Sequence, residues 1–187
     1  MANLRYAPIT DPLQGRVGGV VFRRWFGRLI AAYRPNPPST PPTPDQLAQR
    51  VVFGKANVYA NEAMADPERR AVYERMSPLK QMPARAVAIG DYFNSPEVME
   101  IDLSAFHGQV GDRIKVRATD DVEVRSVHVL IRKSGDGTVL EEADAAFATG
   151  AWHYTCTTAI PPGTFLIIEA KAKDWAGNQG MKILNYP

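Results

Sequence analysis

Apolar and polar residues alternate through the second half of this chain. The clearest run is Phe165–Lys173, in which Glu169, Lys171 and Lys173 are separated by apolar residues. A period of two sends successive side chains to opposite faces, which is the pattern of a half-buried β-strand. Seven such strands are expected over about ninety residues, and this density is typical of a β-sandwich. They are Val98–Leu103, Asp112–Thr119, Val124–Lys133, Val139–Glu142, Ala151–Thr158, Phe165–Lys173 and Gly180–Tyr186.

The period changes to that of a helix in the middle of the chain. Thr43-Pro44-Asp45-Gln46 predicts a helix start, because threonine caps, proline suits the first helical position and glutamine completes a capping box. Leu47, Val51, Gly54 and Val58 then recur at steps of four and three. These steps mark the apolar face of an amphipathic helix.

Two further helices are expected before the strands begin. Asp66-Pro67-Glu68 predicts a second start, and Ser77-Pro78 predicts its end. A third helix is expected over Ala84–Phe93, where Asn94-Ser95-Pro96 would break it.

Residues 20–34 predict a β-hairpin, and a proline-rich arm over residues 35–44 follows it. Placing Phe26-Gly27 in the turn pairs Trp25 with Arg28. Both faces of the hairpin are then largely apolar, and a two-stranded hairpin alone is marginal in water. Some other element must therefore cover it.

Three explanations for what covers the two faces of the hairpin are open. The helices expected over residues 43–76 could pack on the hairpin, or another copy or another protein could bind it. Nucleic acid could also bind the mixture of arginine and aromatic side chains, but no nucleic-acid motif accompanies it and the pI is only about 8.7. The candidate partner-binding residues are Phe22, Arg23, Trp25, Arg28, Ile30 and Tyr33.

Two stretches carry resemblances to known families. Ile114–Asp121 runs into Val124–Ile131, and Phe165–Lys173 runs into a turn that ends at Asn178. This pattern resembles the bacterial and phage immunoglobulin-like (Ig-like) modules of surface, appendage and virion proteins. The resemblance implies a module of a kind that usually holds and presents other groups and rarely carries out chemistry.

The second resemblance lies near the N-terminus and is looser. Gly15-x-x-Gly18, followed by Thr43-Pro44-x-Gln46-Leu47-Ala48-Gln49-Arg50-x-x-Phe53, is similar to a pattern in uncharacterised bacterial and phage proteins. It implies a hairpin followed by a helix. The expected fold class is therefore α+β and multidomain, with an assembly region over residues 1–95 and an all-β Ig-like sandwich over residues 96–187.

No enzymatic motif is present. The three histidines lack the spacing of a zinc site, and neither a Gly-x-Ser-x-Gly elbow nor a Walker-type loop occurs. No cofactor is expected. The single cysteine, Cys156, rules out an intrachain disulfide and is expected to be a buried small side chain.

One candidate for a bound ion remains among the turns. Asp120, Asp121, Asp174 and Asn178 are calcium candidates, because turns after different strands can meet at one end of a sandwich and calcium prefers oxygen ligands. The competing explanation, which the pattern favours, is that Asp and Asn suit turn geometry.

The expected function is that of a non-enzymatic structural protein. Its N-terminal hairpin and arm would join copies of the chain, or dock it on a scaffold, while the Ig-like module is displayed, as in a phage virion or an appendage. The first alternative is a module that binds a glycan or a host protein through Trp152 or Trp175. The second is a nucleic-acid-binding protein. No apolar run is long enough for a membrane helix, and no signal peptide is evident, so synthesis in the cytoplasm is expected, with the final location open.

Overall fold

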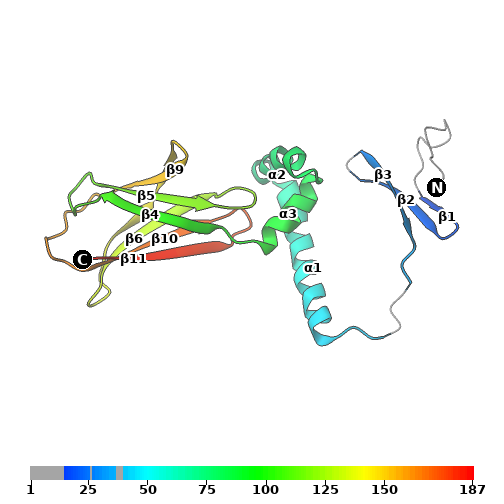
Figure 1. Cartoon of the computed structure of the whole chain (residues 1–187), viewed down its shortest axis with the longest axis horizontal. Coiled ribbons are helices and arrows are strands. Elements are labelled where there is room, and N and C mark those ends of the chain that lie inside the picture. Colours follow the sequence, from blue (N-terminus) through cyan, green and yellow to red (C-terminus); the bar gives the residue numbers. More distant parts are fainter. Residues whose placement is uncertain (1–14, 26, 37–39) are drawn as a thin grey trace.

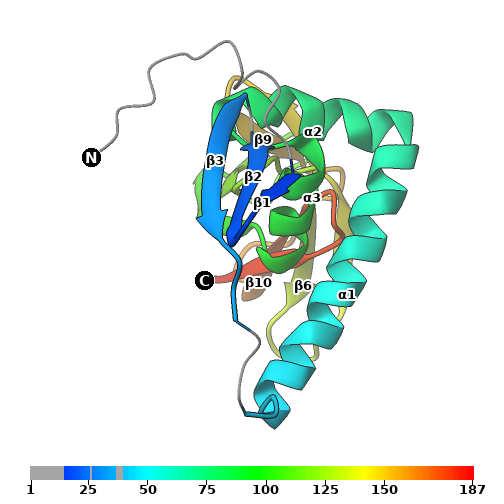
Figure 2. The same cartoon turned by 90° about the vertical axis from the view of Figure 1, so that its right-hand side faces the viewer.

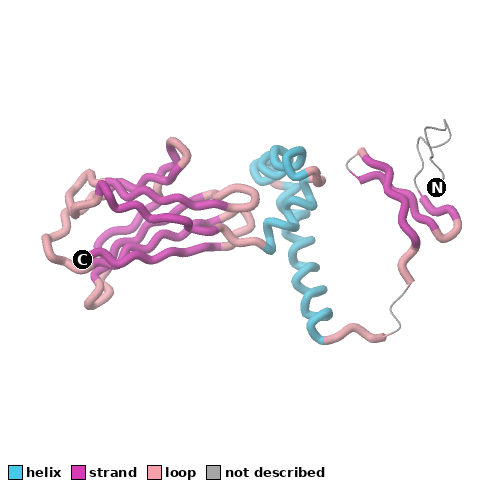
Figure 3. The backbone as a smooth tube through the Cα atoms, in the orientation of Figure 1, coloured by secondary structure: helices cyan, strands magenta, loops and turns pink. Residues whose placement is uncertain are grey.

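The computed structural model describes residues 15–25, 27–36 and 40–187. In this part, three helices and eleven strands in three sheets form an α+β fold. A β-sandwich, a helical layer and a small three-stranded sheet follow one another along the long axis (Figure 1). Figure 3 shows the same succession by secondary structure.

Two four-stranded antiparallel sheets form the sandwich, with strand orders β11-β10-β6-β7 and β4-β5-β9-β8. The strands are β4 (Glu97–Ala105), β5 (Arg113–Thr119), β6 (Ser126–Lys133), β7 (Val139–Asp144), β8 (Ala146–Ala148), β9 (Ala151–Thr155), β10 (Leu166–Lys173) and β11 (Gln179–Tyr186). All seven expected strands are confirmed with shifted ends. The sequence pattern missed β8, because three residues are too few to establish alternation.

The inward-facing residues of both sheets share one core. Ile114 and Val116 of β5 and Val129 and Ile168 of the opposite sheet are all fully buried in the same cluster. Their alternation along each strand is the pattern that the sequence displays. Burial of this cluster is the main stabilisation of the sandwich.

The helical layer consists of α1 (Pro44–Ala65), α2 (Pro67–Lys80) and α3 (Ala84–Phe93). The predicted capping box is confirmed: Oγ1 of Thr43 accepts the Gln46 N–H, and the Gln46 side chain accepts the Thr43 N–H. The prediction that Ser77-Pro78 ends the second helix was wrong, since α2 continues to Lys80. Pro78 lies in the last turn, where its missing N–H costs a single intrahelical hydrogen bond.

The N-terminal sheet consists of β1 (Gly15–Val17), β2 (Val20–Trp25) and β3 (Arg28–Tyr33). The expected pairing of Trp25 with Arg28 is confirmed. Because β1 pairs with β2, the predicted two-stranded hairpin is in fact part of a three-stranded sheet. Phe26 of the predicted turn and residues 37–39 of the predicted arm lie outside the described residues.

Candidate functional site

The apolar stripe that the sequence places along α1 faces away from the other helices. The inner face consists instead of Ala56, Ala60 and Ala63, which are fully buried. Leu47 is 49% exposed, Val51 61% and Val58 58%. The expected helix is confirmed, and its larger apolar side chains lie on the face that does not pack within the chain. Alanine lets α1 approach its neighbours closely, and this leaves the larger side chains on the outside.

The three-stranded sheet is also largely uncovered. Tyr33 is 83% exposed and Leu29 46% on one face, and Trp25 is 40% exposed on the other. Phe22 and Ile30 are half-buried, and Arg23 and Arg28 are exposed. Figure 2 shows this sheet in front of the helices. Contrary to one of the three sequence-based explanations, the helices of the same chain do not bury the hairpin.

A shallow apolar hollow of about 590 Å³ lies between α1 and α3. Phe53 of α1 stacks on Phe93 of α3, with ring centroids 6.4 Å apart. Met82 and Ile89 extend the apolar lining, and Trp25 of the N-terminal sheet also contributes to it. The hollow therefore continues the exposed apolar surface from the sheet onto the helices.

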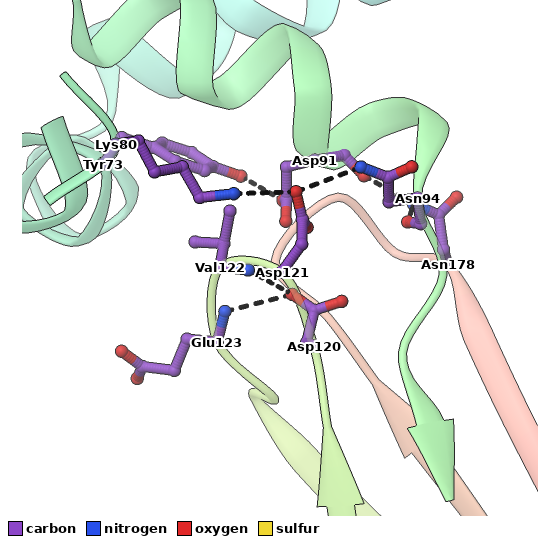
Figure 4. A network of polar contacts seen from close by, with 9 residues as sticks. All are labelled: Tyr73, Lys80, Asp91, Asn94, Asp120, Asp121, Val122, Glu123 and Asn178. Carbon is purple, nitrogen blue, oxygen red and sulfur yellow. Dashed lines mark hydrogen bonds and ion pairs between the residues drawn. The ribbon is translucent and has the colours of Figure 1, made fainter. Parts of the chain in front are cut away.

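Polar contacts join the helical layer to one end of the sandwich. Lys80 of α2 pairs with Asp121 at 2.8 Å, Arg75 pairs with Glu123, and Nδ2 of Asn94 donates to Asp121. Figure 4 shows the contacts of Lys80 and Asn94 with Asp121 in the loop after β5. The helices and the sandwich are thus held together at a polar junction.

Val122 adds an apolar contact to this junction. It is buried in the cluster that contains Tyr73 of α2 and Val87 of α3, and Trp175 packs against the same cluster. Arg125 lies over the Trp175 ring, 4.9 Å from its centroid. Trp175 is therefore a packing residue at the junction and is not displayed as a ligand platform.

A buried carboxylate, Asp91, lies at the centre of the junction. Its Oδ2 accepts a hydrogen bond of 2.6 Å from the Tyr73 hydroxyl, and Tyr59 lies 2.5 Å from that hydroxyl. The pKa of Asp91 is raised to about 7, chiefly by burial and also by the charges of Asp174 and Asp120, while the hydrogen bond from Tyr73 opposes the rise. Burial also raises the pKa values of Tyr73 and Asp174.

Three carboxylates meet at this point. Asp91 of α3, Asp120 after β5 and Asp174 after β10 have carboxylate oxygens that all lie within 4.8 Å of one another. Two of the four predicted calcium candidates, Asp120 and Asp174, are therefore brought together. Every one of these side chains is an oxygen donor of the kind that hard cations prefer.

The other two calcium candidates have different roles. Asp121 pairs with Lys80 and Asn94. Asn178 directs its amide nitrogen to the carbonyl oxygens of Asp91 and Asn94. The sequence reading missed Asp91, although one signal was present: it lies one helical turn after Val87, on the apolar stripe of α3, where an unpaired acid is unusual.

The remaining candidates lie in the sandwich. Trp152 is half-buried beside the exposed Phe147, with ring centroids 5.2 Å apart, and both line a hollow of about 360 Å³. Cys156 is buried, as expected. His128 lies at the surface and hydrogen-bonds to Asp144. Among the described residues, no helix is both long and apolar enough to cross a membrane.

Comparison with known proteins yields no family. No family model and no curated protein matches the chain. Among solved structures, an engineered protein is similar over 49% of this chain, with 20% sequence identity and a TM-score of 0.33. A tetra-tandem repeat from the extending region of a large adhesion protein is similar over 50% of this chain, with 23% sequence identity and a TM-score of 0.32. The match spans about a fifth of each of those chains, 19% and 23% respectively.

Proposed function

We propose that this protein is a non-enzymatic structural component whose copies associate through the N-terminal sheet and α1. The sandwich, proposed to be an Ig-like domain separate from the N-terminal assembly region, would then be displayed. The resemblances in the sequence favour a component of a phage virion or of a bacterial appendage.

The observation that carries this proposal is the exposed outer stripe of α1. An apolar stripe on a helix normally faces a core, and here it faces outward in the single chain. Contiguous exposed apolar surface is a mark of an interaction site. The hollow between α1 and α3 and the uncovered sheet add further exposed apolar surface to the same N-terminal half of the chain.

The spacing of the stripe supports a second copy as its partner. Steps of four, three and four from Leu47 to Val58 are those of a heptad seam, in which like helices pack side by side. A seam of this kind is self-complementary, as a two-fold symmetric interface requires. The proposed partner is therefore another copy of this chain.

The test is the mass of the intact chain in solution, measured by light scattering. The double variant Val51→Glu/Val58→Glu places charges on the outer stripe without altering the buried alanines of α1. We expect a defined oligomer for the intact chain and a folded monomer for the variant, since burying unpaired charges is costly.

Leu79→Glu is the matched control, because Leu79 is 73% exposed on α2 and lies outside the proposed surface. It should leave the oligomer intact. A folded monomer for the unmodified chain at high concentration and low salt would contradict self-association.

A further inference from the structure

Two carboxylates of the cluster at the junction each have a buried oxygen atom that could still bind a ligand. Asp91 is fully buried, and its Oδ1 has no hydrogen-bond partner among the described residues. The Oδ1 of Asp120 is likewise buried and without a partner in that part of the chain. An unpaired buried carboxylate oxygen is costly, because it has lost its water and gained nothing in return.

The second oxygen of each of these two carboxylates is engaged. Oδ2 of Asp91 accepts from Tyr73, and Oδ2 of Asp120 accepts the backbone N–H groups of Val122 and Glu123, both at 3.0 Å. These contacts fix both side chains in place. The two carboxylates are therefore held in place by contacts that need no ion, and each keeps one oxygen free of partners among the described residues.

The third carboxylate, Asp174, is positioned by its own turn. Its Oδ1 accepts the Asn178 N–H at 2.7 Å, and its Oδ2 accepts the Asn178 amide at 2.8 Å. Within the described residues, no ion pair reaches Asp91, Asp120 or Asp174, since the nearby Lys80 pairs with Asp121. The negative charge of the cluster has no side-chain counterpart.

We propose that Asp91, Asp120 and Asp174 bind one Ca²⁺ ion at the junction of α3 with two loops of the sandwich. The ligand set is all oxygen, which suits a hard cation. Calcium–oxygen distances of about 2.3–2.6 Å keep any two ligands of one ion within roughly 5 Å of each other, and one carboxylate oxygen from each of the three residues satisfies this limit, since these oxygens lie within 4.8 Å of one another. Magnesium demands near-ideal octahedral geometry and gives up its water ligands reluctantly, so a site of three carboxylates fixed by the protein favours the larger ion.

Bound calcium would tie three segments that are far apart in the sequence. Asp91 belongs to the helical layer, and Asp120 and Asp174 belong to different loops of the sandwich. The ion would neutralise their mutual repulsion and hold the sandwich firmly on the helices. This role is independent of whether copies of the chain associate.

The first experiment is calorimetric titration of the chelator-treated full chain with CaCl₂ and, separately, MgCl₂. We expect one Ca²⁺ per chain and at least tenfold weaker binding of Mg²⁺. Saturating calcium should raise Tm by about 4 °C or more, because the ion binds only the folded state.

Two variants remove charge and keep the hydrogen bonds. Asp91→Asn retains an acceptor for Tyr73, and Asp120→Asn retains one for the Val122 and Glu123 N–H groups. Each should weaken calcium binding at least tenfold and leave the calcium-free Tm equal or higher, because repulsion among the carboxylates is relieved. Asp120 is only half-buried, so Asp120→Asn still tests calcium binding if Asp91→Asn fails to fold.

Asp144→Asn is the control, since Asp144 is an exposed acid on β7. Calcium binding should be unchanged in this variant. The proposal is overturned if the intact chain shows neither calcium heat nor a Tm shift, as expected if protons alone neutralise the cluster. It is also overturned if magnesium alone binds, or if Asp91→Asn and Asp120→Asn bind calcium as tightly as the control.

Discussion

The side-chain amide of Asn178 donates a hydrogen bond of 2.9 Å to the backbone carbonyl oxygen of Asp91. The same nitrogen lies 2.7 Å from the carbonyl oxygen of Asn94. Carbonyl groups at the C-terminal end of a helix have no intrahelical partner, and here a loop of the sandwich supplies one to α3. A residue 87 positions away in the sequence thus fixes how α3 meets the sandwich.

Asn178→Asp should destabilise the chain by about 2 kcal/mol or more. The substitution replaces the donor with a carboxylate that faces carbonyl oxygens and Asp174, which removes a hydrogen bond from each of these acceptors and adds repulsion. Urea unfolding in the presence of a chelator measures the difference. Asn185→Asp, at an exposed position on β11, should change the free energy of unfolding by no more than about 0.5 kcal/mol. Equal effects of the two substitutions would refute this role for Asn178.

Gly180→Ala should be strongly destabilising. A Cβ atom at Gly180 would overlap the backbone carbonyl of Pro96, and a backbone group cannot move aside as a flexible side chain can. We expect a loss of about 3 kcal/mol or failure to fold. Gly90→Ala is the control, because its Cβ would meet nothing within 4 Å and alanine favours a helix. Thermal unfolding should separate the two variants clearly.

The thiol of Cys156 should be inert in the folded protein. Burial raises its pKa to about 12, and the neighbouring charge of Glu141 contributes to the increase. Since only the thiolate is nucleophilic, a thiol reagent at about pH 8 should label the native chain far more slowly than the urea-unfolded chain. Mass spectrometry counts the label, and rapid labelling of the native chain would contradict the burial of this residue.

The carboxylate of Asp112 should stabilise the folded chain at neutral pH, and this stabilisation should disappear in acid. Its carboxylate accepts the backbone N–H groups of Gln109 and His107, at 2.8 and 2.6 Å, and these bonds hold the pKa of Asp112 below its ordinary value. Because the pKa of Asp112 is lower in the folded chain than in the unfolded chain, its contribution to stability is fully present above the unfolded-state pKa. It is lost as the pH falls through the folded-state pKa, that is, below about pH 4.

Asp112→Asn should therefore lower Tm at neutral pH, and its difference from the unmodified chain should shrink as the pH falls from about 5 to 2. Thermal unfolding at a series of pH values measures this. A difference that stays constant down to pH 2 would show that the carboxylate charge is not involved.

Local features of the sequence predicted local structure well. The start of α1 follows from Thr43 and Gln46, whose side chains satisfy backbone N–H groups within four residues. The strands of the sandwich follow from alternation because each packs one face on a shared core. Such interactions depend on neighbours along the chain or on a period of two, and both can be read from the order of residues.

The cluster at the junction could be predicted only in part. Asp120 and Asp174 stand out because each follows a strand, and strand ends on one side of a sandwich can meet. Asp91 lies inside a helix, and its role depends on how α3 is placed against two loops. That placement rests on Asn178 and Val122, which belong to the loops of the sandwich and lie far from Asp91 in the sequence.

The sequence by itself determined where the three helices and the longer strands lie and that α1 has an apolar stripe at heptad spacing. The tertiary structure alone decided which face of α1 is buried. A period of 3.6 residues allows two opposite faces, and the alanine face lies closest to α2 and α3 because its small side chains permit tight packing. Leu47, Val51 and Val58 consequently remain outside, since burial is decided by the shape of the neighbouring elements as well as by the hydrophobicity of the residue.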